Sequence, residues 1–190
     1  LALVVLAAPL LVTLFQYGEF SAADVDRASL SLQAYGAGLL GFMLVKVLAP
    51  GYFARQDTKT PVKVGIKAMV ANMVFNLALI VPLAHVGLAL ATSLSALLNA
   101  FLLWLGLRRE GVYQAQPGWW LFVLRLVVSA AVMVAVIVFL NKDLAQWLAW
   151  GWQWRSGYLA VMVLAGMAAY FGALLLLGMR MGDLRSRQLE

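Results

Sequence analysis

The chain has 190 residues, of which 64% are hydrophobic and only 12% are charged, and its formal net charge is +6. Soluble domains are about 45–50% apolar and about 25% charged, and a chain of this size cannot bury so much apolar surface in one water-surrounded core. The composition therefore excludes a soluble globular enzyme, a disordered tail and a collagen-like chain. It predicts an integral membrane protein whose apolar surface faces lipid.

Side chains suited to catalysis or metal binding are scarce. The chain has no cysteine and one histidine, His85. This excludes a disulfide frame and a thiolate nucleophile, and neither a histidine metal site nor a Ser-His-Asp triad is expected. There is no P-loop and no G-x-G-x-x-G motif. We predict that the chain is not an enzyme and has no catalytic residue, metal ligand or cofactor.

Long hydrophobic segments divide the chain. They cover residues 1–15, 33–49, 64–83, 86–107, 121–140 and 157–179. Because they are long and rich in Leu, Ala and Met, they predict an all-α, polytopic bundle of about six transmembrane helices. The second segment stops at Pro50-Gly51, a helix-ending pair, and the third and fourth form a hairpin. Residue 1 is Leu, inside an apolar run, so we expect a fragment of a longer protein.

Two of the stretches that connect the hydrophobic segments contain further signals. Ser21 and Asp24 have capping-box spacing, which predicts a short helix leading into the second segment. Loop 142–156 contains four tryptophans, and this clustering predicts an aromatic belt at the membrane interface. These tryptophans are Trp147, Trp150, Trp152 and Trp154.

Basic residues predict the orientation. Most of the 14 lysines and arginines lie after the second segment, after the fourth, or in the tail with Arg180, Arg185 and Arg187. The other side has only Arg27, Lys142 and Arg155. The positive-inside rule therefore places the C-terminus in the cytoplasm. The net charge indicates topology and contact with anionic lipids, not a nucleic-acid partner.

Polar residues inside the segments are the candidate site. Lys46 is a charge inside the second segment, and it faces either a cavity or, by snorkelling past Pro50, the interface. Asn72 and Asn76 share one face of the third segment. The fourth segment has a polar stripe of Thr92, Ser95 and Asn99. The two polar faces form either interhelical hydrogen bonds or the wall of a hydrophilic pathway.

Small residues predict close helix contacts in two segments. The second segment has two pairs at four-residue spacing, Ala34 with Gly38 and Ala37 with Gly41. The sixth segment has a similar row, which comprises Ala165, Ala169 and Ala173, with Ala168 and Gly172 beside it. Such faces let helix backbones approach closely in lipid, either as fixed packing or as sliding surfaces.

The most specific string in the chain is VKVLAPGYFARQDTKTPVK, residues 45–63. Shorter matching stretches include Asn76-Leu77-Ala78, Pro82-Leu83-x-His85-x-Gly87-Leu88 and Gln116-Pro117-Gly118-Trp119. Together they resemble the MurJ (also called MviN) family of bacterial lipid II flippases, and the resemblance covers the whole chain.

The resemblance implies a fold of fourteen transmembrane helices in the MOP transporter superfamily, of which this chain is the last six. It implies that lipid II, the lipid-linked peptidoglycan precursor, is flipped across the cytoplasmic (inner) membrane by alternating access. The role would be cell-wall synthesis and cell shape. The implied partners are the undecaprenyl-pyrophosphate-linked substrate, membrane lipids and other cell-wall synthesis proteins. Because no nucleotide motif is present, an ion gradient or the membrane potential would drive transport.

The resemblance also suggests site residues. Lys46 falls where family members carry a lysine near the central cavity, so Lys46, Asn72 and Asn76 are candidate substrate-cavity residues. The last two segments would line a groove for the lipid tail, whereas the key cavity arginines of the family lie in the N-terminal half. The loop motif consists of Arg55, Gln56, Asp57, Lys59, Thr60, Pro61 and Lys63. This loop is either a conformational latch between bundles or a topogenic signal.

Two other functions remain open at the level of sequence. One is a small-molecule or drug exporter of the same superfamily, which would need a carboxylate within the membrane for cation coupling. None of the acids lies within the six segments, and this weighs against an exporter for this part of the protein. The other is a non-transporting membrane scaffold for cell-wall enzymes, in which Lys46 and the asparagine face would tolerate apolar replacement.

Overall fold

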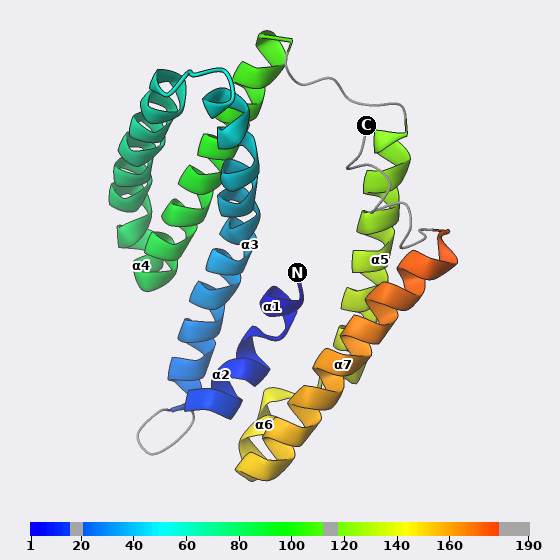
Figure 1. The fold of residues 1–190 in the computed structure, drawn as a ribbon. Coiled ribbons are helices and arrows are strands. Elements are labelled where there is room, and N and C mark those ends of the chain that lie inside the picture. The colour runs from blue at the N-terminus through cyan, green and yellow to red at the C-terminus, as the bar shows by residue number, and fades with distance from the viewer. Residues whose placement is uncertain (16–20, 112–117, 179–190) are drawn as a thin grey trace. The chain divides into compact units, whose positions relative to one another are not determined.

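The computed structural model describes residues 1–15, 21–111 and 118–178 of the chain, and its regular elements are all helices (Figure 1). They are α1 (Ala2–Val5), α2 (Ala7–Phe15), α3 (Ala22–Phe53), α4 (Lys59–Arg109), α5 (Trp119–Leu140), α6 (Leu144–Ala149) and α7 (Trp152–Leu176). Within the described ranges, four of them, α3, α4, α5 and α7, are long and apolar enough to cross a membrane. The all-α fold class is therefore confirmed.

The chain divides into two compact units. One unit comprises Leu1–Leu14 and Gln116–Glu190, so it contains α1, most of α2, and α5 to α7. The second unit is Phe15–Ala115, which contains α3 and α4. The end of the last predicted segment at residue 179 and the basic tail residues Arg180, Arg185 and Arg187 lie outside the described residues.

Helix α4 is a hairpin of two arms. Ala84 has φ 46° and ψ −122°, which is not helical, and the 51-residue helix reverses direction there. Residues 59–83 form the first arm and residues 85–109 the second, and Figure 1 shows them side by side. At the tip, a Cβ on Gly87 would overlap the carbonyl group of Leu79. Only glycine lets the two arms approach this closely.

Helix α3 is longer than the predicted segment at both ends. The Ser21 side chain and the Asp24 carboxylate form the expected capping box, with Ser21 N donating to Asp24 Oδ2 over 3.1 Å. The helical stretch predicted to lead into the second segment is the first part of α3, which continues without a break to Phe53. Its predicted end at Pro50-Gly51 is wrong. Proline removes one backbone donor, but the helix continues for a final turn beyond it.

The small-residue face of α3 packs against the second arm of α4. A Cβ on Gly38 would overlap Ser93, and one on Gly41 would lie 2.7 Å from the Ala96 carbonyl carbon. Ser93 Oγ donates to the Ala34 carbonyl over 2.6 Å. The close contact predicted for this face is confirmed for Ala34, Gly38 and Gly41, whereas Ala37 is exposed. The hydrogen bond from Ser93 to Ala34 holds α3 and the second arm of α4 in one register along this face.

In the other unit, α5 and α7 pack against each other around Gly166. A Cβ on Gly166 would lie 2.8 Å from Ile137 Cδ1, whereas Gly172 has no neighbour within 4 Å. The close contact between α5 and α7 is therefore at Gly166, which is next to the predicted row of Ala165, Ala169 and Ala173. Helix α7 begins at Trp152 rather than at residue 157, because part of the tryptophan-rich loop is helical.

The first segment is broken into α1 and α2 at Leu6. Pro9 explains the break, since it has no N–H to donate to the Val5 carbonyl and its ring crowds that carbonyl. Pro9 therefore interrupts the first segment three residues earlier in the chain, at Leu6.

Candidate functional site

The polar faces of the two α4 arms meet, as predicted from their spacing. Asn72 Nδ2 on the first arm donates to Ser95 Oγ on the second arm over 3.2 Å. Asn76 Nδ2 donates to Asn72 Oδ1 over 2.9 Å, and Ser95 Oγ donates to the Thr92 carbonyl over 2.8 Å. These bonds form a polar ladder, defined here as Asn72, Asn76, Ser95 and Asn99. Its first three members link the arms through side-chain hydrogen bonds.

The polar ladder has two acceptors left over. Asn76 Oδ1 and Asn99 Oδ1 are buried and have no hydrogen-bond partner among the described residues. A buried acceptor without a donor costs about 1–3 kcal/mol, so such oxygens are seldom left unused. Chemically they suit a donor such as water, an amide N–H or a sugar hydroxyl. The ladder therefore holds the hairpin together and keeps acceptor capacity.

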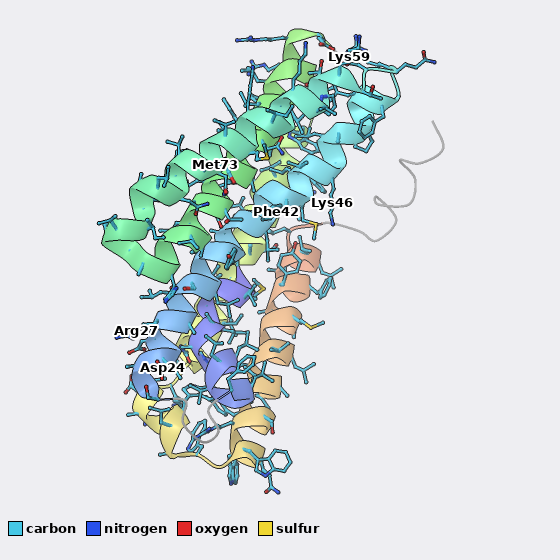
Figure 2. The ribbon with its side chains drawn as sticks, turned by 90° about the vertical axis from the view of Figure 1, so that its left-hand side faces the viewer. Asp24, Arg27, Phe42, Lys46, Lys59 and Met73 are labelled. Carbon is cyan, nitrogen blue, oxygen red and sulfur yellow. The ribbon has the colours of Figure 1, made fainter. Side chains whose placement is uncertain are left out.

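Lys46 lies on α3, away from the polar ladder. Its side chain is exposed, and Phe42 lies one turn before it on the same exposed side (Figure 2). Within residues 1–15, 21–111 and 118–178, no ion pair involves Lys46 and no hydrogen bond joins it to Asn72 or Asn76. The structure thus brings the two asparagines together but does not bring Lys46 to them.

Pro50 lies one turn after Lys46 and affects its backbone. In a regular helix the N–H of residue 50 would donate to the carbonyl of residue 46, and proline cannot do so. The charged side chain and a carbonyl without its helical donor therefore belong to the same residue. This combination favours a polar environment around Lys46.

The loop motif forms the turn between α3 and α4. Gln56 has φ 59°, which lets the chain reverse after α3. Asp57 Oδ1 then accepts hydrogen bonds from Lys59 N over 3.1 Å and Thr60 N over 3.0 Å, so it caps α4. Pro61 lies in the first turn, where no helical N–H is needed. Hydrogen bonds from the side chain and then the backbone of Thr60 hold the pKa of the Asp57 carboxyl below its usual range.

Arg55 ties this turn to the far end of α4. Its Nη1 forms an ion pair with Glu110 Oε2. Both side chains are partly exposed, so the pair contributes modestly to stability. Both residues belong to the same unit. In this conformation Arg55 is therefore a tie within one unit, while Lys59 and Lys63 extend from the first arm with exposed side chains.

Arg155 is buried, although its place in the sequence predicted an exposed residue of a loop on the outer side. Its Nε donates to the Trp147 carbonyl and its Nη2 to the Leu148 carbonyl, each over 2.8 Å, and its Nη1 reaches the Val12 carbonyl at 3.5 Å. These carbonyls belong to the last turns of α6 and α2, where no helical donor is available. One guanidinium thus joins three helices. The sequence could not predict this, because the acceptors are distant backbone atoms.

The tryptophans of residues 142–156 are of two kinds. Trp147 is buried, and its ring centroid lies 5.4 Å from that of Trp150 and 5.7 Å from that of Tyr158. The interpretation of Trp147 as part of an aromatic belt is therefore wrong, because it forms a local core. Trp152 and Trp154 are exposed and suit an interface.

Comparison with known proteins identifies the family. The family model described as "Lipid II flippase MurJ" matches residues 1–156. This chain belongs to the MurJ family. It is 50% identical over 186 residues to the "Probable lipid II flippase MurJ" of Vibrio cholerae, covering 98% of this chain and 35% of that protein. The corresponding protein of Haemophilus influenzae is 45% identical over 180 residues, covering 95% of this chain and 35% of the relative.

A third relative, the "Lipid II flippase MurJ" of Burkholderia cenocepacia, is 38% identical over 196 residues, with 98% of this chain and 36% of the relative covered. The chain thus spans about 35% of the length of the MurJ relatives it matches. Family membership and the long apolar helices together identify it as part of a multi-pass membrane protein. The polar ladder, Lys46 and the loop motif all fall within the matched residues, and their roles stay predictions.

Proposed function

We propose that this chain forms the C-terminal portion of a transporter that flips lipid II across the bacterial cytoplasmic (inner) membrane for cell-wall synthesis. The observation that carries the proposal is the match to MurJ proteins over 98% of the chain at 50% identity. The substrate would be the undecaprenyl-pyrophosphate-linked peptidoglycan precursor. The chain would act as a transporter without enzymatic activity or a cofactor.

The chemical task is to move a polar, anionic head group through hydrocarbon. Buried charges and unpaired polar groups are costly there, so a water-accessible cavity with cationic and hydrogen-bonding walls lowers the barrier. The exposed ammonium group of Lys46 would attract the diphosphate. The acceptors Asn76 Oδ1 and Asn99 Oδ1, which are buried in this conformation, would accept hydrogen bonds from the sugar or peptide in a conformation that opens the polar ladder.

Alternating access would expose the cavity to each side of the membrane in turn. The division of the chain into two compact units, each packed around its own glycine contacts, supports movement of helix bundles as bodies. An ion gradient or the membrane potential would supply the energy. The basic ends of α3 and α4, together with the C-terminus, would face the cytoplasm by the positive-inside rule.

The test uses the full-length protein that contains this chain, expressed in bacteria depleted of their own lipid II flippase. We expect it to restore growth and to raise the amount of lipid II accessible from outside the cell. Lys46→Met should lower the accessible amount severalfold, and Lys46→Arg should retain most of it, while Lys142→Met serves as a matched exposed control. A correctly inserted protein that restores neither growth nor lipid II exposure would refute the proposal.

The same experiment separates the alternative functions. A scaffold would restore growth equally with Lys46→Met and Asn76→Leu, because neither residue would touch a substrate. An exporter would leave lipid II exposure unchanged and would instead change resistance to small toxic compounds.

A further inference from the structure

A row of lysines lies on the exposed face of the first α4 arm, at the end where the arm begins. Lys59, Lys63 and Lys67 follow one another at four-residue spacing, about one helical turn apart, and all are exposed. Lys59 lies at one end of the arm in Figure 2. Arg108 and Arg109, at the end of the second arm, are also exposed. The hairpin brings these arginines to the same end of the unit as the Arg55–Glu110 pair.

Among the described residues of the unit, no carboxylate forms an ion pair with these lysines or with Arg108 and Arg109. Helix α4 contains no Asp and no Glu. The Asp57 carboxylate is used by the α4 cap, and Glu110 pairs with Arg55. Over the described part of the chain, the lysine row forms no ion pair. The row is therefore available to an anion from outside the unit.

The same face continues as an apolar track towards the hairpin tip. Ile66, Val70, Met73 and Leu77 are each more than half exposed, and their spacing of four, three and four residues keeps them on one side of the helix. Met73 lies about midway along this side in Figure 2. Val64 and Ala68, on the opposite side, are buried. Lysines and apolar residues thus form one continuous surface.

We propose that this surface binds an anionic phospholipid, with its phosphate at Lys59, Lys63 and Lys67 and an acyl chain along Ile66 to Leu77. A lipid matches both parts of the surface, because its charged head and its apolar chain have the same order as the lysines and the apolar track. An acidic peptide would match only the lysines. Lys67 begins about 12 Å along the arm from Lys59, and its long side chain can reach back to the head group.

The proposal uses the orientation inferred above, which places the lysine row at the cytoplasmic leaflet. Anionic lipids there attract each nearby lysine with a free energy that corresponds to about a fivefold gain in binding. The row should therefore select anionic over neutral lipid at this one surface. Flipping of lipid II does not depend on this selection, so the two proposals can fail separately.

The test places a photo-crosslinking amino acid at Val70 of the full-length protein, reconstituted in vesicles of phosphatidylcholine and phosphatidylglycerol at a ratio of three to one. Mass spectrometry then identifies the cross-linked lipid. We expect the ratio of phosphatidylglycerol to phosphatidylcholine adducts to be at least fivefold above the ratio of the two lipids in the vesicles. The enrichment should disappear with Lys59→Gln, Lys63→Gln and Lys67→Gln combined, and should persist with the three corresponding Lys→Arg changes.

Lys142→Gln, which removes an exposed lysine elsewhere, should leave the enrichment unchanged. Adducts that follow the bulk lipid composition would overturn the proposal. So would cross-links to another segment of the transporter, which would mean that protein covers this face. Cross-links to undecaprenyl diphosphate, added as a separate probe, at the expense of phosphatidylglycerol would assign the surface to the substrate instead.

Discussion

The hydroxyl of Tyr52 donates a hydrogen bond to the Leu103 carbonyl over 2.7 Å, linking the last turn of α3 to the second arm of α4. The Tyr52 side chain is fully buried in a cluster with Val64, Leu103 and Leu107. Gly106 makes room for it, because a Cβ at that position would overlap the Tyr52 hydroxyl. The hydroxyl and the glycine therefore depend on each other.

This dependence predicts a coupled pair of substitutions. Tyr52→Phe should lower the free energy of unfolding by about 1 kcal/mol through the lost hydrogen bond. Gly106→Ala should cost about 1–3 kcal/mol through overpacking. In combination with Tyr52→Phe, Gly106→Ala should cost clearly less, because the overlapping oxygen is gone. Thermal unfolding of the full-length protein in detergent measures all three, and strictly additive effects would contradict the contact.

Arg155 provides a second prediction. Arg155→Met should destabilise the unit of α2 and α5 to α7 by about 1–3 kcal/mol for each carbonyl left without a donor. Arg155→Lys should recover little, because an ammonium group lacks the planar fork that reaches several acceptors. Arg27→Met, which removes an exposed arginine, is the control and should change stability by less than about 0.5 kcal/mol. Full recovery with lysine would show that charge alone matters here.

The tip of the α4 hairpin predicts a stabilising substitution. Ala84 has a positive φ of 46°, a region that costs a non-glycine residue about 1–3 kcal/mol. Ala84→Gly should therefore raise the unfolding temperature, and Ala84→Val should lower it. Ala78→Gly, in the regular part of the first arm, should instead destabilise by about 0.5–1 kcal/mol. The experiment compares the direction in which each alanine-to-glycine change moves the unfolding temperature. A change in the same direction at Ala84 and Ala78 would exclude a strained turn at Ala84.

The α4 cap predicts a pH dependence. The pKa of Asp57 is held below its unfolded value, about 3.9, by hydrogen bonds from Thr60. Its contribution to stability is thus complete above that unfolded value and is lost as the pH falls through the lower, folded pKa. Asp57→Asn should reduce the loss of unfolding temperature between about pH 5 and pH 2. The control is Asp143→Asn, since the Asp143 side chain makes no cap hydrogen bond; an equal effect of both changes would dismiss the cap.

The sequence predicted features that depend on local spacing. Long apolar runs located the helices, the short link between the third and fourth runs indicated the hairpin, and Gly38 and Gly41 marked a contact face. The Asn72–Ser95 bond followed from the two polar stripes of that hairpin. In each case, residues close in sequence determine which side of a helix is polar or small.

Features that depend on distant backbone atoms were missed. A charged residue in the loop at 142–156 is expected to be exposed, but Arg155 is bound by acceptors that include the Val12 carbonyl, far away in the sequence. A tryptophan in this loop is expected at the membrane interface, yet the rings of Trp150 and Tyr158 pack against Trp147. Pro50 usually ends a helix, but packing of Tyr52 stabilises a further turn of α3. Tertiary contacts decided these three positions.

The bond from Arg155 to Val12 also imposes an order on biosynthesis. Translation proceeds from the N-terminus, so the carbonyl of Val12 is made long before its donor. The unit Phe15–Ala115 is continuous in sequence and can pack as soon as its helices enter the membrane. The other unit is discontinuous and closes only when Arg155 has left the ribosome. During synthesis the Val12 carbonyl of α2 therefore lacks its arginine donor until α6 and α7 have been made.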